Sequence, residues 1–299
     1  PDAKVIDVTL RDGGFRTGFD WSEDEIVSHS ICALKAGCHY VELGYFGGVP
    51  ELHGVSGLGP AADLNPDILA CLSDRIGAGA LCAMVHPSAV DEAPNFDKAR
   101  DSGLSMVRIV YHSSWHEKFV EIAEKARRAG LVTAGNIALA SRYEPEVIGG
   151  IVASLSERVD VLYFADTCGA LMPGEVSALV ELGLAKGAGD VGFHGHDYLS
   201  MALANAHAAS MAGARWIDAS VQGIGRGAGN LRLELWLALC EVHGRANENG
   251  LAGLLPAIAA IERRLGPAMA PDIESLVCGA LNLTPPQEDA LCEVIDQRG

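Results

Sequence analysis

Short apolar runs alternate with longer amphipathic segments along most of this chain. The runs are rich in Val, Ile and aromatic residues, and glycine, proline or helix-capping residues separate them from the segments that follow. Near-continuous apolar runs of this kind are typical of parallel strands that are buried on both faces. We therefore predict strands at residues 4–10, 40–44, 80–85, 106–111, 132–137, 161–166, 191–196 and 215–220. The helices are predicted at residues 22–36, 66–73, 88–102, 114–129, 144–156, 173–185, 199–212 and 231–243.

A strict succession of strand and helix implies a parallel sheet with right-handed crossovers, and eight such units close into a barrel. An open, doubly wound sheet is the alternative, but the regularity of the units favours closure. We therefore expect an α/β fold, a (β/α)8 TIM barrel, over residues 1–247. Prolines interrupt the helical pattern after that point, so residues 248–299 are expected to form a short helical C-terminal extension.

The composition supports a large core, since 49% of the 299 residues are hydrophobic and 20% are charged. The net charge of −17 argues against a basic face that binds nucleic acid. No apolar run is long enough to cross a membrane, and the chain starts with a strand-like segment instead of a secretory signal. The eight cysteines are scattered without a Cys-x-x-Cys pair, as expected for reduced thiols in a cytoplasmic protein.

The seventh predicted strand ends in His194 and His196, which are separated by one glycine. Alternate side chains of a strand share a face, so the two imidazoles point the same way. Two hydrogen-bonded histidines at a strand end are the simpler interpretation. Neutral imidazole is, however, the commonest protein ligand of metals, and a pair on one face supplies half a metal site.

Asp12 follows the first strand, and closure of the barrel brings that strand next to the eighth and near the seventh. Asp12, His194 and His196 can then converge with a polar group of the last loop, although a helix cap or an ion pair with Arg11 would also explain Asp12. No cysteine joins the set, so Mn²⁺ or Mg²⁺ is favoured and Co²⁺ or Zn²⁺ is the alternative. Glu42, at the end of the second strand, is expected to accept a hydrogen bond from a metal ligand.

Other polar side chains follow the remaining strands at the same end of the barrel, where barrel enzymes carry their chemistry. We predict that they bind the substrate. They are Tyr45, His86, His112, Asn136 and Thr167. The last loop, residues 223–230, is rich in glycine, but it closes the eighth unit instead of opening a dinucleotide-binding one, so NAD is not expected.

Three of these segments carry a family resemblance: residues 9–13, 194–197 and 223–230. Together and in this order they resemble the signatures of the DRE-TIM metallolyases, the HMGL-like superfamily of (β/α)8 enzymes. The branch of the 4-hydroxy-2-oxovalerate aldolases is the most similar, because residues 166–173, 199–205 and 213–220 also match its pattern.

The resemblance implies Asp12, His194 and His196 as metal ligands, with Asn230 as a fourth, and Arg11 as the cation that stabilises an enolate oxygen. Arg11 and Asp12 would thus be the catalytic pair. The implied activity is that of a carbon–carbon lyase, a class II pyruvate-type aldolase that acts on a 2-oxo acid through a metal-bound enolate. A Claisen-type condensing enzyme, which joins an acyl-CoA to a 2-oxo acid, is the alternative, and a non-catalytic barrel is a third.

Two departures from the aldolase pattern concern the substrate. The aldolases carry a base histidine shortly after the Arg-Asp-Gly motif, whereas this chain has Phe15 in that neighbourhood. Rim residues that could replace it are Tyr45, His86, His112 and Tyr143. Asp197 also stands where the aldolases usually have asparagine.

The expected partners are a small 2-oxo acid and an aldehyde. The sequence contains no indication of an aldehyde dehydrogenase partner, although the resemblance makes one conceivable. Apolar residues 251–265 and 273–277 exceed what a barrel needs, so we expect a homodimer; capping of the barrel by these helices is the alternative.

Overall fold

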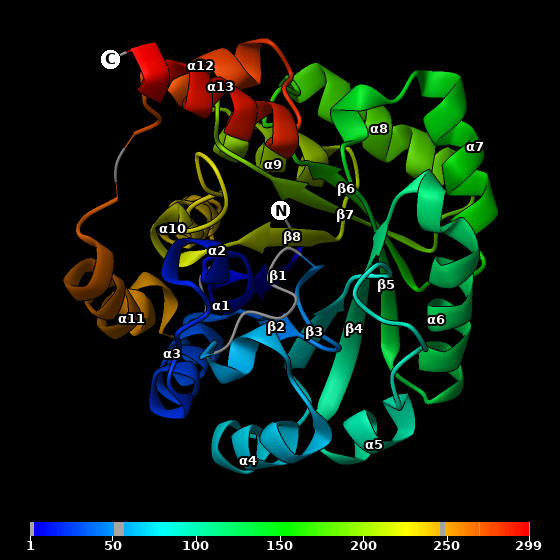
Figure 1. Ribbon diagram of the computed structural model, residues 1–299, viewed down its shortest axis with the longest axis vertical. Helices are drawn as coiled ribbons and strands as arrows, with labels where there is room; N and C mark the ends of the chain where they lie inside the picture. Colours follow the sequence, from blue (N-terminus) through cyan, green and yellow to red (C-terminus); the bar gives the residue numbers. More distant parts are fainter. Residues whose placement is uncertain (1–2, 51–56, 246–248, 269, 299) are drawn as a thin grey trace.

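The computed structural model describes residues 3–50, 57–245, 249–268 and 270–298. Its parallel strands pair in sequence order from β1 to β8, and β8 pairs with β1, so the barrel is closed (Figure 1). The predicted TIM barrel is therefore confirmed. The strands are β1 Lys4–Asp7, β2 Tyr40–Tyr45, β3 Leu81–Val85, β4 Leu104–Tyr111, β5 Val132–Ile137, β6 Val161–Asp166, β7 Asp190–Gly195 and β8 Trp216–Ala219.

The helices surround the barrel and follow the strands in the expected order (Figure 1). The barrel helices are α1 Thr9–Asp12, α2 Gly14–Thr17, α3 Glu23–Ala36, α4 Pro66–Ile76, α5 Phe96–Asp101, α6 His116–Arg128, α7 Pro145–Leu155, α8 Pro173–Ala185, α9 Ala202–Met211 and α10 Leu233–Val242. The last three are α11 Gly250–Leu265, α12 Ile273–Ala280 and α13 Pro285–Arg298. Short 3₁₀ turns include η2 Pro60–Ala62, η4 Ala140–Arg142 and η5 Val221–Gly223.

The first strand is shorter than predicted, and this correction matters for the site. The strand ends at Asp7, whose carboxylate accepts hydrogen bonds from the backbone and the hydroxyl of Thr9. This turns the chain into α1, so Arg11 and Asp12 lie on a helical turn and not in the loop of an extended strand. The helix predicted at residues 88–102 is also wrong in extent, because α5 begins only at Phe96, where Asn95 caps it.

Two layers of side chains fill the interior of the barrel. The first is apolar and consists of Ile6, Val8, Cys82, Met106, Ala134, Val161, Tyr163 and Trp216. The buried charged residues Arg108 and Asp218 each follow a member of this layer by two positions, on the same face of the strand, and Glu42 follows Tyr40, which packs against the layer, in the same way. The charged layer therefore lies toward the carboxyl ends of the strands, where a barrel enzyme carries its site.

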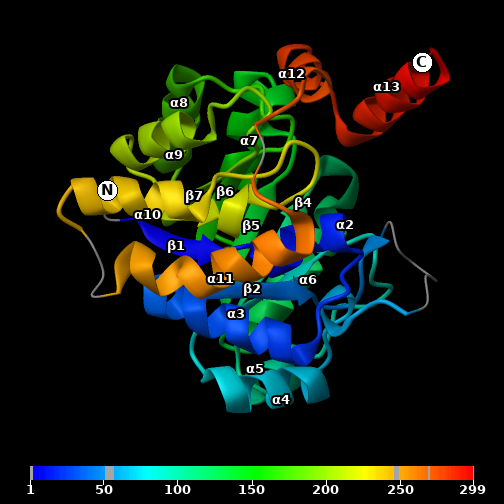
Figure 2. The ribbon, with the colours of Figure 1, turned by 90° about the vertical axis from the view of Figure 1, so that its left-hand side faces the viewer.

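The last three helices occupy two places on the barrel. Helix α11 runs alongside α3 and also contacts α10 (Figure 2), so much of its apolar face is buried against the wall. Helices α12 and α13 reach the loops at the carboxyl ends of the strands instead. The Asn282 side chain accepts a hydrogen bond from Ser141 at 2.7 Å, and Glu288 accepts one from Tyr198. The predicted boundary between residues 247 and 248 lies outside the described residues.

None of the helices in the described part of the chain has both the length and the apolar character that a membrane span needs.

Self-association remains a prediction, and in the structure its support comes from exposed apolar residues in and after α12 and not from those of α11. Packing against α3 accounts for Leu254, Ala257 and Ile261 of α11, but Ile273 of α12 is 76% exposed and the nearby Leu281 is 62% exposed. We expect light scattering at micromolar concentration to give a dimer, and an Ile273→Glu/Leu281→Glu variant to give a monomer because charge opposes burial of this patch. A strictly monomeric parent protein would contradict the prediction.

Gly44, which follows Glu42 and Leu43 in β2, is required by a close approach of the chain. A Cβ atom at this position would lie 1.9 Å from the carbonyl oxygen of Ala61 in η2. Gly44→Ala should therefore lower the free energy of unfolding by about 3 kcal/mol, as overpacking does. Gly150→Ala is the matched control, since a Cβ in the middle of α7 meets nothing within 4 Å and should stabilise by roughly 0.5 kcal/mol. Equal denaturation midpoints for the two variants would be the contrary result.

Candidate metal centre

His194 and His196 lie at the carboxyl end of β7, inside the barrel. His194 is the penultimate residue of the strand, and His196 follows it in an isolated bridge with Asn230. Their exposed fractions are only 5% and 7%, and the Nε2 atoms of the two rings are 3.3 Å apart. The structure therefore brings the two imidazoles together on one face, as their spacing predicts.

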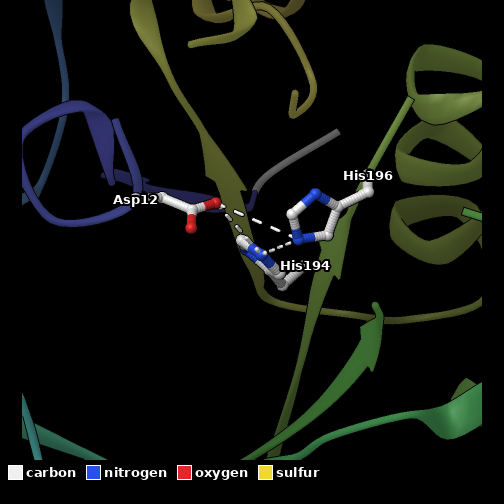
Figure 3. Close-up of side chains that lie close together, drawn as sticks. All are labelled: Asp12, His194 and His196. Atoms are coloured by element: carbon white, nitrogen blue, oxygen red, sulfur yellow. Dashed lines mark hydrogen bonds and ion pairs between the residues drawn. The ribbon is translucent and has the colours of Figure 1, made fainter. Parts of the chain in front are cut away.

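Asp12 completes the group from α1. Its Oδ2 atom lies 3.8 Å from His194 Nε2 and 4.0 Å from His196 Nε2, and it has no hydrogen-bond donor among the described residues. The three side chains point toward one another (Figure 3). Among the described residues, this is the group of histidine, cysteine and carboxylate side chains that is compact enough to hold a metal ion.

The loop after β8 folds back over this group and brings in Asn230. Asn230 N donates to Gly223 O at 2.8 Å, and Leu231 N donates to Gly195 O at 3.1 Å. Gly225 lies so close that a Cβ there would be 2.4 Å from Asn230 Nδ2 and 3.0 Å from Asp12 Oδ2. The amide nitrogen of Asn230 and Asp12 Oδ2 thus both lie close to Gly225, and the Oδ1 atom of Asn230 is buried without a donor.

The pKa values of Asp12 and His196 favour the protonation states that bind a cation. Burial raises the pKa of Asp12, but the charge of Arg11 and the two nearby histidines outweigh it and lower the pKa to about 2. Burial lowers the pKa of His196 to about 4, and His194 adds to this effect while Asp12 opposes it. At neutral pH the carboxylate is therefore ionised and this imidazole is neutral, which are the states that metal ligands need.

Arg11 is buried beside Asp12 and held by two carboxylates. Its Nη1 atom is 3.0 Å from Asp12 Oδ1, and its Nε atom donates to Glu42 Oε2 at 2.7 Å. Burial lowers the pKa of Arg11, but Glu42 and Asp12 outweigh it, so the pKa lies well above its ordinary value. Glu42 was expected to accept from a metal ligand, whereas in the structure it accepts from Arg11, the neighbour of one.

Two residues that the sequence analysis missed complete the surroundings. Asp218 of β8 accepts from His194 Nδ1 at 2.9 Å, which leaves His194 Nε2 with its lone pair facing Asp12 and His196. Arg108 of β4 pairs with Asp218 and, at 3.2 Å, with Glu42. A charged residue in the middle of an otherwise apolar strand was the available signal for both.

A model of the family described as HMGL-like matches residues 2–259 of the chain. The chain belongs to the HMGL-like family.

Two proteins of similar sequence and one solved structure agree with this family assignment. An oxaloacetate decarboxylase of Mycobacterium tuberculosis is 30% identical over 243 residues, which are 80% of this chain and 70% of that protein. The 4-hydroxy-2-oxovalerate aldolase 4 of Rhodococcus opacus is 29% identical over 272 residues, or 89% of this chain and 75% of that protein. The solved N-terminal domain of a Bacteroides vulgatus protein superposes with a TM-score of 0.82 and 21% identity, over 97% of this chain and 96% of that one, which shows the fold alone.

A divalent metal, which the family implies, fits this donor set. Two cations, Arg11 and Arg108, face three buried carboxylates, those of Asp12, Glu42 and Asp218, and this leaves a net charge of −1 if the histidines are neutral. Several buried oxygens of the described residues have no hydrogen-bond donor, and Asp12 Oδ2 and Asn230 Oδ1 are among them. This set of oxygen and nitrogen donors without a thiolate suits a divalent metal.

The predicted substrate-binding residues are distributed around the rim. Tyr45 lies close enough to Arg11 that its phenolate form, when present, raises the pKa of the guanidinium. His86 and His112 follow strands across the barrel from β7 and β8, and both rings pack against Trp115. The cluster of three ligands therefore does not include them.

Asn136 and Thr167 occupy the ends of β5 and β6. Asn136 is 4% exposed, and its Oδ1 atom has no donor among the described residues. Thr167 accepts a hydrogen bond from Leu139 N at 2.9 Å and so joins two loops. Tyr143, one of the alternative bases, is half-buried, and this burial raises its pKa.

The two departures from the aldolase pattern have structural counterparts. Phe15 of α2 packs edge-on against Phe19 and Tyr45, with ring centroids 5.3 Å and 6.2 Å away, and Arg226 lies over its ring. The position is thus part of an aromatic cluster. Asp197 accepts from Ala202 N at 2.9 Å and so supports the start of α9.

The low pKa of His196 predicts a pH-dependent stability of the protein in the presence of a chelator. The folded pKa of about 4 lies below the unfolded value of about 6.5, so the unfolded chain binds more protons between these values. The free energy of unfolding should therefore fall as the pH decreases from 6.5 to 4, by on the order of 3 kcal/mol from this group. His196→Asn should remove that component in urea titrations, whereas the exposed control His243→Asn should keep it. Parallel pH profiles for the parent protein and His196→Asn would contradict the assignment.

Proposed function

We propose that this protein is a divalent-metal-dependent lyase that breaks or forms the C3–C4 bond of a 2-oxo acid, with the enolate of pyruvate as the common intermediate. The observation that carries the proposal is the buried group of Asp12, His194 and His196 with the Arg11 guanidinium fixed beside it. Mn²⁺ or Mg²⁺ is the proposed cofactor, and the partners are a small 2-oxo acid and an aldehyde.

The names of the relatives support this chemistry. Decarboxylation of oxaloacetate and retro-aldol cleavage of 4-hydroxy-2-oxovalerate both break the C3–C4 bond and leave its electron pair in the enolate of pyruvate. In the first case C4 departs as carbon dioxide. In the second case the 4-hydroxyl group of the substrate gives its proton to a base, and C4 departs as the carbonyl carbon of an aldehyde. The enolate then takes up a proton at C3.

Asp12, His194 and His196, with Asn230 as a fourth candidate, would hold the metal. When bound, the metal supplies a Lewis acid that draws electron density from the 2-oxo group. Arg11 contributes a fixed positive charge at the position where the C2 oxygen becomes negative. Since this charge is held by Glu42 and Asp12 in advance, little reorganisation is needed when the bond breaks.

Decarboxylation is a second candidate, and the surroundings of Phe15 favour it. Aldol cleavage requires a base that takes the proton of the 4-hydroxyl group, but α2 offers aromatic carbon at this position. Loss of carbon dioxide requires no such base. Product analysis with oxaloacetate and with 4-hydroxy-2-oxovalerate separates the two candidates.

The test of the shared step is exchange of the methyl protons of pyruvate with D₂O in the presence of Mn²⁺, followed by NMR. No acceptor is needed, because exchange requires only formation and reprotonation of the enolate. We expect exchange with the parent protein and a loss of roughly two to three orders of magnitude with Arg11→Lys, which keeps a charge but loses the planar pair of donors. Metal binding should survive in this variant.

Two controls define the outcome. Arg75→Lys, a surface arginine on α4, should leave the exchange rate unchanged. The His194→Ala/His196→Ala variant should lose both exchange and tight Mn²⁺ binding in titrations. If a panel of 2-oxo acids shows no exchange above that of Mn²⁺ in buffer, the proposed function fails; if Arg11→Lys exchanges at the parent rate, only the role of Arg11 fails.

A further inference from the structure

Arg108 is the one fully buried cation of the charged layer that the proposed chemistry leaves without a role. It lies in β4, directly above the apolar layer of the barrel, and its side chain is 0% exposed. Its guanidinium carbon is 4.4 Å from the centroid of the Tyr163 ring, which therefore supports it from one side. The side chain spans the barrel interior and reaches carboxylates of two different strands.

The first contact of Arg108, made through Nη2, leads by way of Asp218 to the proposed metal ligand His194. Arg108 Nη2 pairs with Asp218 Oδ2, the same oxygen that accepts from His194 Nδ1 at 2.9 Å. Both partners therefore share one buried oxygen of Asp218. Because an ionised carboxylate only accepts hydrogen bonds, His194 carries its proton on Nδ1 and presents Nε2 to Asp12 and His196.

The second contact of Arg108, made through Nη1, leads by way of Glu42 to Arg11, the cation proposed to stabilise the enolate oxygen. Arg108 Nη1 is 3.2 Å from Glu42 Oε2, and this same oxygen accepts from Arg11 Nε at 2.7 Å. Arg11 in turn reaches Asp12 Oδ1 through Nη1. The two contacts thus join both sides of the ligand group, and each passes through a carboxylate that is completely buried.

We propose that Arg108 is a positioning residue, which holds Asp218 and Glu42 so that His194 and Arg11 keep one fixed arrangement around the metal site. The inference rests on the proposed function insofar as it assigns His194 to a metal and Arg11 to an oxyanion. The contacts run from Arg108 through Asp218 to His194 and through Glu42 to Arg11, so Arg108 acts on His194 and Arg11 only through these two carboxylates.

Stability alone does not explain a cation at this place. Buried ion pairs often contribute less to stability than well-packed apolar side chains of the same volume, because desolvation offsets their attraction. The planar guanidinium donates a hydrogen bond to Asp218 through Nη2 and forms an ion pair with Glu42 through Nη1, a combination that the single ammonium group of lysine does not reproduce. The geometry therefore matches a requirement for orientation.

The test compares full-length Arg108→Lys and Arg108→Met proteins with the parent. We measure Mn²⁺ affinity by titration calorimetry, the visible absorption spectrum of the Co²⁺ form, and the imidazole ¹⁵N shifts of His194 in the metal-free protein. We expect the affinity to fall by roughly 10- to 100-fold, as it does when the support of a ligand is lost. The Co²⁺ spectrum should change, and His194 should no longer show a single Nδ1-protonated form.

Asp218→Asn is a second variant in case Arg108→Met does not fold. It keeps the size of the side chain and should reproduce the changes at His194 without altering Arg11 directly. Leu72→Ala is the matched control for lost stability, because Leu72 is fully buried in α4 but remote from the charged layer. It should lower the denaturation midpoint and leave the Co²⁺ spectrum and Mn²⁺ affinity at parent values.

The outcomes separate this inference from the proposed function. If folded Arg108→Lys and Asp218→Asn both retain the parent Co²⁺ spectrum, Mn²⁺ affinity and His194 shifts, the positioning role is overturned. The same holds if the parent protein binds no divalent metal, and then the proposed function fails as well. If the variants change the site but the parent protein exchanges no 2-oxo acid protons, the positioning role stands and the proposed reaction fails.

Discussion

Compensation of buried charge is the constraint on which the carboxyl end of this barrel depends. Arg11, Glu42, Arg108 and Asp218 are each nearly or completely removed from solvent, and an unpaired charge in such a place would cost several kcal/mol. Each is paired with at least one of the others, and the chain of contacts ends at Asp12 on one side and at His194 on the other. The ligand geometry is therefore a consequence of how the interior satisfies its charges.

This arrangement also explains which parts of the structure could be predicted. The barrel follows from local patterns, since each apolar run and each capped helix identifies its own element, and closure follows from their number. The spacing of His194 and His196 determines a shared face without any knowledge of distant residues. These features need only short-range information, so the sequence sufficed for them.

The features that the sequence analysis missed depend on contacts between distant residues. Arg108 and Asp218 are 110 positions apart, and only the closed barrel brings β4 and β8 to opposite sides of one interior. The helical turn of Arg11 and Asp12 combines the local hydrogen bonds from Thr9 to Asp7 with a distant one, in which Val221 N donates to the Thr9 hydroxyl at 2.8 Å across 212 positions. Propensity alone favoured a longer strand there, and tertiary contacts overrode it.

The contacts of α12 and α13 have a consequence for the order in which the protein is completed during synthesis. Asn282 meets Ser141 across 141 positions, and Glu288 meets Tyr198 across 90. These last segments leave the ribosome after every strand of the barrel, so the contacts of Ser141 and Tyr198 with the tail are among the last that the chain can make. Because the tail meets loops and the buried charges meet one another, substitutions in α12 and α13 can alter the surroundings of Ser141 and Tyr198 while the pairs of Arg108 with Glu42 and Asp218 stay in place.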